Sequence, residues 1–96
     1  MQILLIEDDA SVADFICQGF AQQGDSVVHA ADGAQGLQLA GTGSHDALIV
    51  DRMLPEVDGI TIINTLREAG DITPILVLSA LGHVDDRVRA RLVQYR

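Results

Sequence analysis

The sequence predicts an α/β fold in which a doubly wound parallel sheet is covered by helices on both faces. Three observations predict it. Short apolar segments of strand length recur along the chain, amphipathic helical stripes separate them, and acidic or hydroxyl residues follow several strand ends. Strands that are apolar on both faces need helices on both sides, and right-handed crossovers then produce the doubly wound arrangement.

The expected elements alternate from strand to helix four times. The predicted strands are residues 3–6, 27–28, 47–50 and 75–78. Gly24 and Gly70 are the expected stop signals of the first and third helices. The apolar stripes that define the four helices contain, in order, Val12, Phe15, Ile16, Gly19 and Phe20; Ala34, Leu37 and Ala40; Ile60, Ile63 and Leu66; and Val84, Val88, Leu92 and Tyr95. The pattern therefore predicts four strands and no fifth.

Composition narrows the function classes. The 96 residues suffice for one small domain with one core, and we take residues 1–96 as that domain. The formal net charge is −8, and every cationic side chain is an arginine, because the sequence contains no lysine. An acidic domain is a poor candidate for binding a phosphate backbone, so we expect no direct nucleic-acid binding. We expect no membrane association either, and the lone Cys17 suits a reducing cytoplasm.

Polar residues follow three strands that should meet at one edge of the sheet. Glu7 and Asp8 follow the first strand, Asp51 the third and Ser79 the fourth. Neighbouring parallel strands lie about 4.8 Å apart, so Asp8 and Asp51 are expected close together. Clustered carboxylates repel one another unless a cation intervenes, and hard oxygen donors with room for water favour Mg²⁺. Asp51 is therefore predicted to be a metal-held nucleophile or a metal ligand.

A plainer interpretation exists for each of these polar residues taken singly. One acidic residue at a strand end is more often a turn or cap residue, and Asp9 is the best candidate for a cap before the first helix. Three carboxylates and a hydroxyl at the same edge are harder to explain in that way. Cys17 is expected to be packed or half-buried, and His29, His45 and His83, which lack metal-ligand spacing, are expected to face solvent.

Three motifs in order resemble the bacterial response-regulator receiver domain, which has a flavodoxin-like fold. They are "ILLIEDD" (residues 3–9), "LIVDRMLPEVDGI" (residues 48–60) and "PILVLSA" (residues 74–80). The spellings "DRMLP" and "DDRV" are similar to the subfamily whose members carry a C-terminal winged-helix DNA-binding domain. The resemblance extends from Met1 to about Arg89, which is most of the chain.

The resemblance implies a role in two-component signal transduction. Asp51 would accept a phosphoryl group from the phosphohistidine of a sensor histidine kinase, and Ser79 would hydrogen-bond that group and act as a switch. Mg²⁺ would be held by Asp8, Asp51, the backbone carbonyl of Met53 and, through water, Glu7. The chain would then be no enzyme, since it would only undergo Mg²⁺-assisted self-phosphorylation, and it would act in the cytoplasm.

The sequence departs from this family after "VDDRVRA", because "RLVQYR" does not resemble the family's continuation. The fifth strand, the fifth helix, the Lys-Pro pair and the aromatic switch residue of the family are not found, and Tyr95 does not occupy the switch position. We therefore expect a C-terminally truncated receiver domain without an output domain, in which phosphorylation of Asp51 is inefficient.

Other functions compete with this one. The foremost is a degenerate receiver that acts as a phosphorylation-independent dimerisation or interaction module. A Mg²⁺-dependent phosphohydrolase would need a second carboxylate where Met53 stands, and a nucleotide-binding domain would need a glycine-rich loop where "EDDAS" stands. A homodimer is expected, because without a fifth strand residues 75–78 would form an exposed apolar edge and the last helix would lack part of its packing surface.

Overall fold

The computed structural model describes residues 1–79 and 91–95, with Ser79 and the residues of the last strand described by their backbone alone. The elements along the chain are β1 (Gln2–Ile6), α1 (Ala10–Ala21), β2 (Ser26–Ala30), α2 (Gly33–Thr42), β3 (Ala47–Asp51), α3 (Gly59–Glu68), β4 (Ile75–Ser79) and β5 (Arg91–Tyr95). The predicted order of the first seven elements is therefore confirmed.

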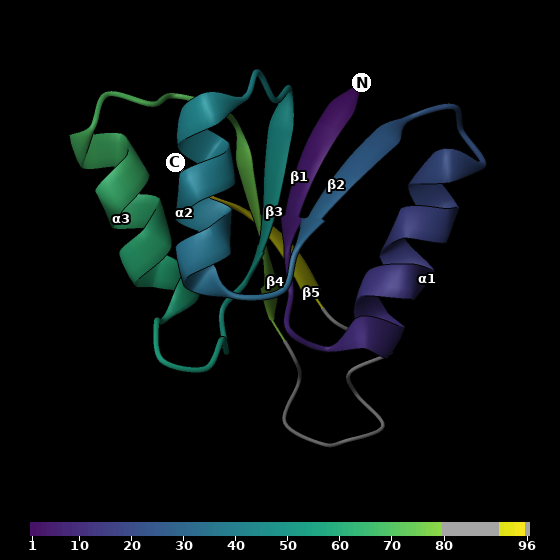
Figure 1. Cartoon of the computed structure of the whole chain (residues 1–96), viewed down its shortest axis with the longest axis horizontal. Helices are drawn as coiled ribbons and strands as arrows, with labels where there is room; N and C mark the ends of the chain where they lie inside the picture. The colour runs from purple at the N-terminus through teal and green to yellow at the C-terminus, as the bar shows by residue number, and fades with distance from the viewer. Residues whose placement is uncertain (80–90, 96) are drawn as a thin grey trace.

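The strands form one sheet in the order β2-β1-β3-β4-β5, in which the first four strands run parallel. In the described part of the chain, α1 lies on one face, and α2 and α3 lie side by side on the other (Figure 1). This doubly wound arrangement brings the carboxyl ends of β1, β3 and β4 to the same edge of the sheet. We call this edge the carboxyl edge, and it is the place where open parallel sheets bind their ligands.

Two apolar clusters hold the sheet between its layers. The larger lies under α2 and α3 and includes Leu4, Leu48, Val50 and Ile62. The smaller lies under α1, where Leu5 and Ile49 are buried among half-buried helix residues. Residues of β1 and β3 alternate between the two clusters, as expected for strands that are covered on both faces.

Both helix starts and helix ends follow local rules. The Asp9 side chain accepts hydrogen bonds from the backbone N–H groups of Ser11 and Val12, so its predicted role as the cap of α1 is confirmed. Gly24 and Gly70, the predicted stop signals, have φ values of +85° and +86°. Such left-handed backbone after a helix suits glycine because it has no Cβ.

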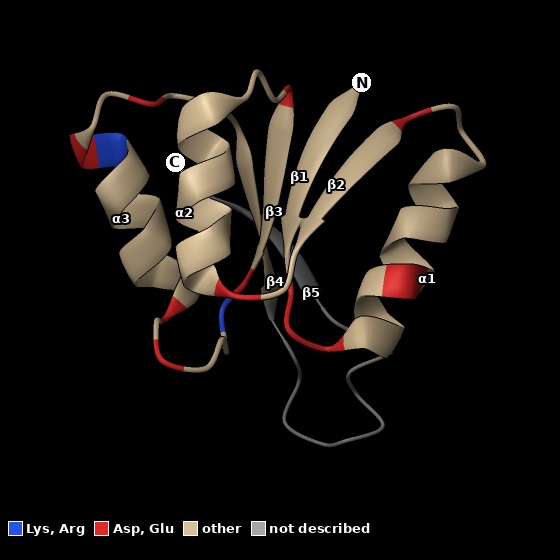
Figure 2. Ribbon diagram, viewed as in Figure 1, with Lys and Arg blue, Asp and Glu red and all other residues tan. Residues whose placement is uncertain are grey.

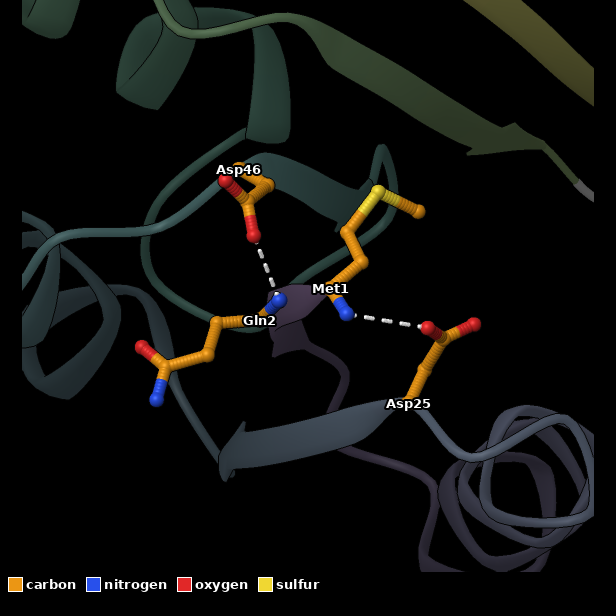
Figure 3. Close-up of polar contacts among 4 residues, drawn as sticks. All are labelled: Met1, Gln2, Asp25 and Asp46. Carbon is orange, nitrogen blue, oxygen red and sulfur yellow. Dashed lines mark hydrogen bonds and ion pairs between the residues drawn. The ribbon is translucent and has the colours of Figure 1, made fainter.

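The start of β1 is tied to both of its neighbours at the opposite, amino edge of the sheet. The Met1 ammonium group lies 3.0 Å from Asp25 Oδ1, and the Gln2 N–H donates to Asp46 Oδ2 over 2.7 Å (Figure 3). These contacts hold the register of β1 against β2 and β3. The relative positions of the strand ends at the carboxyl edge follow from that register.

The C-terminal part of the prediction is wrong, because the sheet has a fifth strand where the sequence predicted none. Leu92 and Tyr95 belong to β5, which pairs antiparallel with β4, rather than to a helix. Val84 and Val88, the other residues of that expected helix, lie outside the described residues. Because β5 covers the edge of β4, residues 75–78 are interior, and the exposed apolar edge expected from the sequence does not exist.

Two smaller predictions can be compared with the structure. Cys17 is half-buried, as expected. His45 is partly buried rather than solvent-facing: its Nε2 lies 3.3 Å from the Leu39 carbonyl oxygen and its Nδ1 is buried. His83 lies outside the described residues. Within the described residues, no helix is long and apolar enough to cross a membrane.

Candidate metal and phosphoryl site

Acidic residues gather at the carboxyl edge, in the loops that follow β1 and β3 (Figure 2). Glu7, Asp8 and Asp51 each offer a carboxylate oxygen there, and these oxygens all lie within 4.8 Å of one another. Glu7 is 2% exposed and Asp51 is 8% exposed, whereas Asp8 is exposed to solvent. The structure therefore brings together the three acidic residues that the sequence selected.

Burial makes Glu7 the most strongly perturbed acid of the site. Burial, a hydrogen bond with Asp51 and the charge of Asp51, in that order, raise the pKa of Glu7 from 4.5 to about 8. The charge of Asp8 also raises this pKa, and the Asp9 N–H, which donates to Glu7 Oε1 over 3.2 Å, lowers it. At neutral pH Glu7 therefore keeps its proton unless a cation is present.

The contact between the Glu7 and Asp51 carboxylates requires a proton or a cation between them. Two carboxylates are both acceptors, so they can hydrogen-bond to each other only if one is protonated. Among the described residues, no donor reaches Glu7 Oε2, although this atom is buried. A proton on Glu7, which its raised pKa implies, or a bound metal ion would compensate this buried oxygen.

Asp51 is held by the backbone around it. It is the last residue of β3, and its Oδ1 accepts the N–H of Met53 over 3.0 Å. The next N–H, of Arg52, donates to the Leu78 carbonyl oxygen over 3.0 Å, which ties the end of β3 to β4. Both bonds fix the direction in which the Asp51 carboxylate leaves the sheet.

Gly59, at the start of α3, lets the loop fold back onto Asp51. Its N–H donates to the Arg52 carbonyl oxygen over 3.1 Å. A Cβ at this position would collide with the Asp51 carbonyl oxygen and lie 2.9 Å from Arg52 Cα. Only glycine permits so close an approach of the start of α3 to the end of β3. Gly59 is therefore part of the mechanical support of the site.

The same loop contains a tight turn that sequence patterns did not indicate. Glu56 has a φ of +70°, and the Val57 N–H donates to the Pro55 carbonyl oxygen over 2.7 Å. This is a γ-turn around a left-handed, non-glycine residue, an uncommon and strained conformation. No sequence rule assigns φ > 0 to a glutamate, so this turn could not be predicted from residue type.

Two further residues of the expected site are described in part. Met53 has a 70% exposed side chain, and its N–H, rather than its carbonyl, is the group with an observed partner in the site. Ser79 ends β4, one residue beyond Leu78, which pairs with Asp51. In the pairing of β4 with β5, Ser79 stands opposite Arg91.

The donor set fits a hard divalent cation. It consists of three carboxylates, of which Glu7 has a buried oxygen without a donor among the described residues and Asp8 is exposed to solvent. Mg²⁺ prefers few protein ligands, oxygen donors and retained waters, and it would remove the repulsion between Glu7 and Asp51. His29 is not among the residues that could hold the ion in the described part of the chain.

A doubly wound sheet with a cluster of carboxylates after β1 and β3 is the arrangement expected of a receiver domain. The chain belongs to the response regulator receiver domain family, whose sequence profile matches residues 3–95. The family predicted from the three motifs is therefore confirmed.

Several known regulators resemble the chain in sequence. It is 43% identical over 89 residues to the probable transcriptional regulatory protein SilR of Salmonella typhimurium, covering 93% of this chain and 39% of that protein. Identity to the transcriptional regulatory protein HprR of Escherichia coli is also 43% over 89 residues, covering 93% of this chain and 40% of that protein. The chain thus spans about two fifths of the length of these relatives.

Solved structures agree with the fold. The receiver domain of Francisella response regulator 1452 has a TM-score of 0.80 and 33% identity, over 92% of this chain and 73% of that one. The response regulator TrrA of Thermotoga maritima, solved with Mg²⁺ and BeF, also has a TM-score of 0.80, over 85% of this chain and 71% of that one. Its identity is 22%, so it supports the fold alone.

Proposed function

We propose that this chain is a phosphoacceptor module of two-component signalling, in which Asp51 takes a phosphoryl group from a phosphohistidine of a sensor histidine kinase. The observation that carries the proposal is the cluster of Glu7, Asp8 and Asp51 at the carboxyl edge, with Asp51 oriented by the Met53 N–H. Membership of the receiver family supports the same reaction.

In the proposed reaction an Asp51 carboxylate oxygen forms a bond to phosphorus while the P–N bond to the kinase histidine breaks. The electron pair of that bond returns to the imidazole, and Asp51 becomes an aspartyl phosphate. Each chain accepts one phosphoryl group, so the module is not a turnover enzyme. Phosphoryl transfer relies on positioning and on charge stabilisation, and the backbone bonds around Asp51 supply the positioning.

Asp8, Asp51, the Met53 carbonyl and, through water, Glu7 would hold Mg²⁺. When bound, the ion would neutralise the charge that develops on the transferring phosphoryl oxygens. We expect millimolar Mg²⁺ to raise the melting temperature of the protein by mass action. The rise should be absent in Asp8→Ala, and an equal rise in that variant would contradict the assignment.

The test of phosphoryl acceptance is incubation with acetyl phosphate and Mg²⁺, followed by intact-mass measurement. We expect a single phosphate adduct that is lost in Asp51→Asn. Asp46→Asn is the matched control, because Asp46 lies at the amino edge, where it accepts the Gln2 N–H. An adduct that survives Asp51→Asn would overturn the proposal. In the family that the chain resembles, a lysine contacts the phosphoryl group, and this sequence contains no lysine. Loss of one such contact costs about 2.7–4 kcal/mol by analogy with an oxyanion-hole donor, so we expect slower acceptance than in a lysine-containing receiver domain.

A second candidate function is an interaction module that pairs with another copy of this chain. The observation that favours it is Phe15, which is 70% exposed on α1. The half-buried Val12, Ile16 and Phe20 lie on the same helix. Light scattering over a concentration series, with Phe15→Ser for comparison, tests this homodimer. A wild-type chain that stays monomeric throughout would exclude it.

A further inference from the structure

His29 contacts the backbone of the candidate site from the neighbouring strand. It lies on β2, exposed to solvent, and its Nε2 is 2.7 Å from the carbonyl oxygen of Glu7. A carbonyl oxygen only accepts hydrogen bonds, so the Nε2 atom must carry the hydrogen. The imidazole N–H of His29 is therefore the donor, and the backbone carbonyl of Glu7, the first residue of the acidic cluster, is the acceptor.

The His29 hydrogen bond lies just beyond the end of the backbone hydrogen-bond ladder between β1 and β2. The last backbone bond between these two strands runs from the Glu7 N–H to the Ala30 carbonyl oxygen over 3.0 Å. β2 ends at Ala30, and the N–H of Ala31, which belongs to the same peptide group as the Ala30 carbonyl and points away from β1, donates to Gln35 Oε1. The Glu7 carbonyl lies beyond the last paired residues, and the His29 side chain supplies its donor.

The Glu7 carbonyl belongs to the peptide group that leads to Asp8. Because a peptide group is planar, holding its C=O also sets its N–H and the direction to the Asp8 Cα. Glu7 and Asp51 are buried and have little freedom, whereas Asp8 is exposed and follows the strand end directly. The orientation of this peptide therefore decides where the third carboxylate of the cluster lies.

We propose that His29 is a positioning residue of the carboxylate site. Its hydrogen bond to the Glu7 carbonyl holds the Glu7–Asp8 peptide in the orientation that brings the Asp8 carboxylate to Glu7 and Asp51. His29 acts through the backbone and is not itself a metal ligand, since the described cluster of potential ligands does not include it. The role rests on the proposed function to the extent that the positioned carboxylates serve Mg²⁺ binding.

The chain offers a conservative replacement and a matched control. His29→Gln keeps a side-chain N–H that can reach the carbonyl, and His29→Ala removes the donor. His45→Ala removes a similar imidazole-to-carbonyl contact, to Leu39, away from the carboxyl edge. Magnesium affinity is measured by calorimetry for the four proteins, and urea unfolding reports the stability of each.

Loss of a residue that orients metal ligands from outside the coordination shell typically weakens metal binding by about 10- to 100-fold. We expect His29→Ala to weaken Mg²⁺ binding by at least about tenfold, and His29→Gln to recover most of that loss. His45→Ala should bind Mg²⁺ as the wild type does. Unchanged affinity in His29→Ala, or equal weakening in His29→Ala and His29→Gln, would overturn the positioning role.

A second readout separates this proposal from the proposed function. In Mg²⁺-free protein, the backbone amide resonance of Asp8 should shift more in His29→Ala than in His29→Gln, and the imidazole nitrogens of the wild type should show the Nε2–H form. If the wild type binds no Mg²⁺, the proposed function fails and these resonances still decide the role of His29. An Asp8 resonance that is the same in all variants would refute it.

Discussion

Replacing Glu7 by glutamine tests whether the site stores electrostatic strain in the absence of metal. Glu7 is buried, and its pKa is raised from 4.5 to about 8, mainly by burial and then by Asp51. Glu7→Gln substitutes a neutral amide of nearly the same shape. The variant therefore removes the cost of ionising the buried acid while keeping its packing and its contact with the Asp9 N–H.

The sign of the pH effect follows from the direction of the shift. Between pH 4.5 and about 8 the folded protein holds a proton on Glu7 that the unfolded chain has released. The folded state binds more protons in this window, so the free energy of unfolding decreases as the pH rises. The contribution of Glu7 is complete below about pH 4.5 and is lost as the pH passes through about 8.

The size of the effect is bounded by the same two pKa values. Each pKa unit is worth about 1.4 kcal/mol, so the difference between 4.5 and about 8 sets an upper limit of about 5 kcal/mol. We expect Mg²⁺-free wild-type protein to lose several kcal/mol between about pH 5 and about pH 9.

Urea unfolding in the presence of a chelator, followed by circular dichroism across this pH range, measures the effect. Glu7→Gln should lack most of the decrease and should be more stable than the wild type at about pH 9. Glu68→Gln, which replaces an exposed glutamate at the end of α3, is the control and should follow the wild type. A wild-type stability that rises over this range, or a Glu7→Gln variant with the wild-type slope, would refute the reasoning.

Three further predictions concern the loop after β3 and the start of β5. Gly59→Ala should lower stability by about 1–3 kcal/mol in urea unfolding, because the added Cβ meets the backbone of Asp51 and Arg52; wild-type stability would show that the loop gives way easily. Glu56→Gly should raise stability by up to about 1 kcal/mol, since glycine tolerates the φ of +70°; a loss of stability would mean that the Glu56 side chain contributes more than the turn costs. Arg91→Gln should slow formation of the phosphate adduct by about tenfold or more, because the backbone of Arg91 lies opposite Ser79 and its cation would support phosphoryl transfer if it reached the site. Arg67→Gln, at the other end of the sheet, should leave the rate unchanged.

The acidic cluster was predictable because it depends on local patterns. Each apolar run shows where its strand ends, and parallel strands must end at the same edge. Glu7, Asp8 and Asp51 follow directly from these two rules, and the structure places them within 4.8 Å of one another. The Gly59 contact and the His29 bond were not predictable in the same way, because each depends on how two separate segments approach in space.

The direction of β5 lay beyond the sequence patterns for a related reason. Leu92 and Tyr95, three residues apart, fit a helical stripe, and nothing local in a five-residue segment fixes whether it pairs or in which direction. In the structure β5 runs against β4, so its first residue, Arg91, stands opposite Ser79. A parallel strand would have brought its last residue to that position. Antiparallel pairing therefore sets an arginine of a lysine-free chain beside the carboxyl edge, and this backbone placement is the reason that Arg91 is worth testing.

The presence of β5 also affects which surface could pair with another copy of the chain. The edge strand next to β4 in the described sheet is β5, which carries Arg91 and Gln94 in its sequence and is five residues long. Short edge strands with a charged residue resist pairing with another chain. A homodimer would therefore have to form through another surface, and the exposed Phe15 on α1 is the described residue that best fits one. A Phe15→Ser variant that self-associates like the wild type would remove α1 from consideration as well.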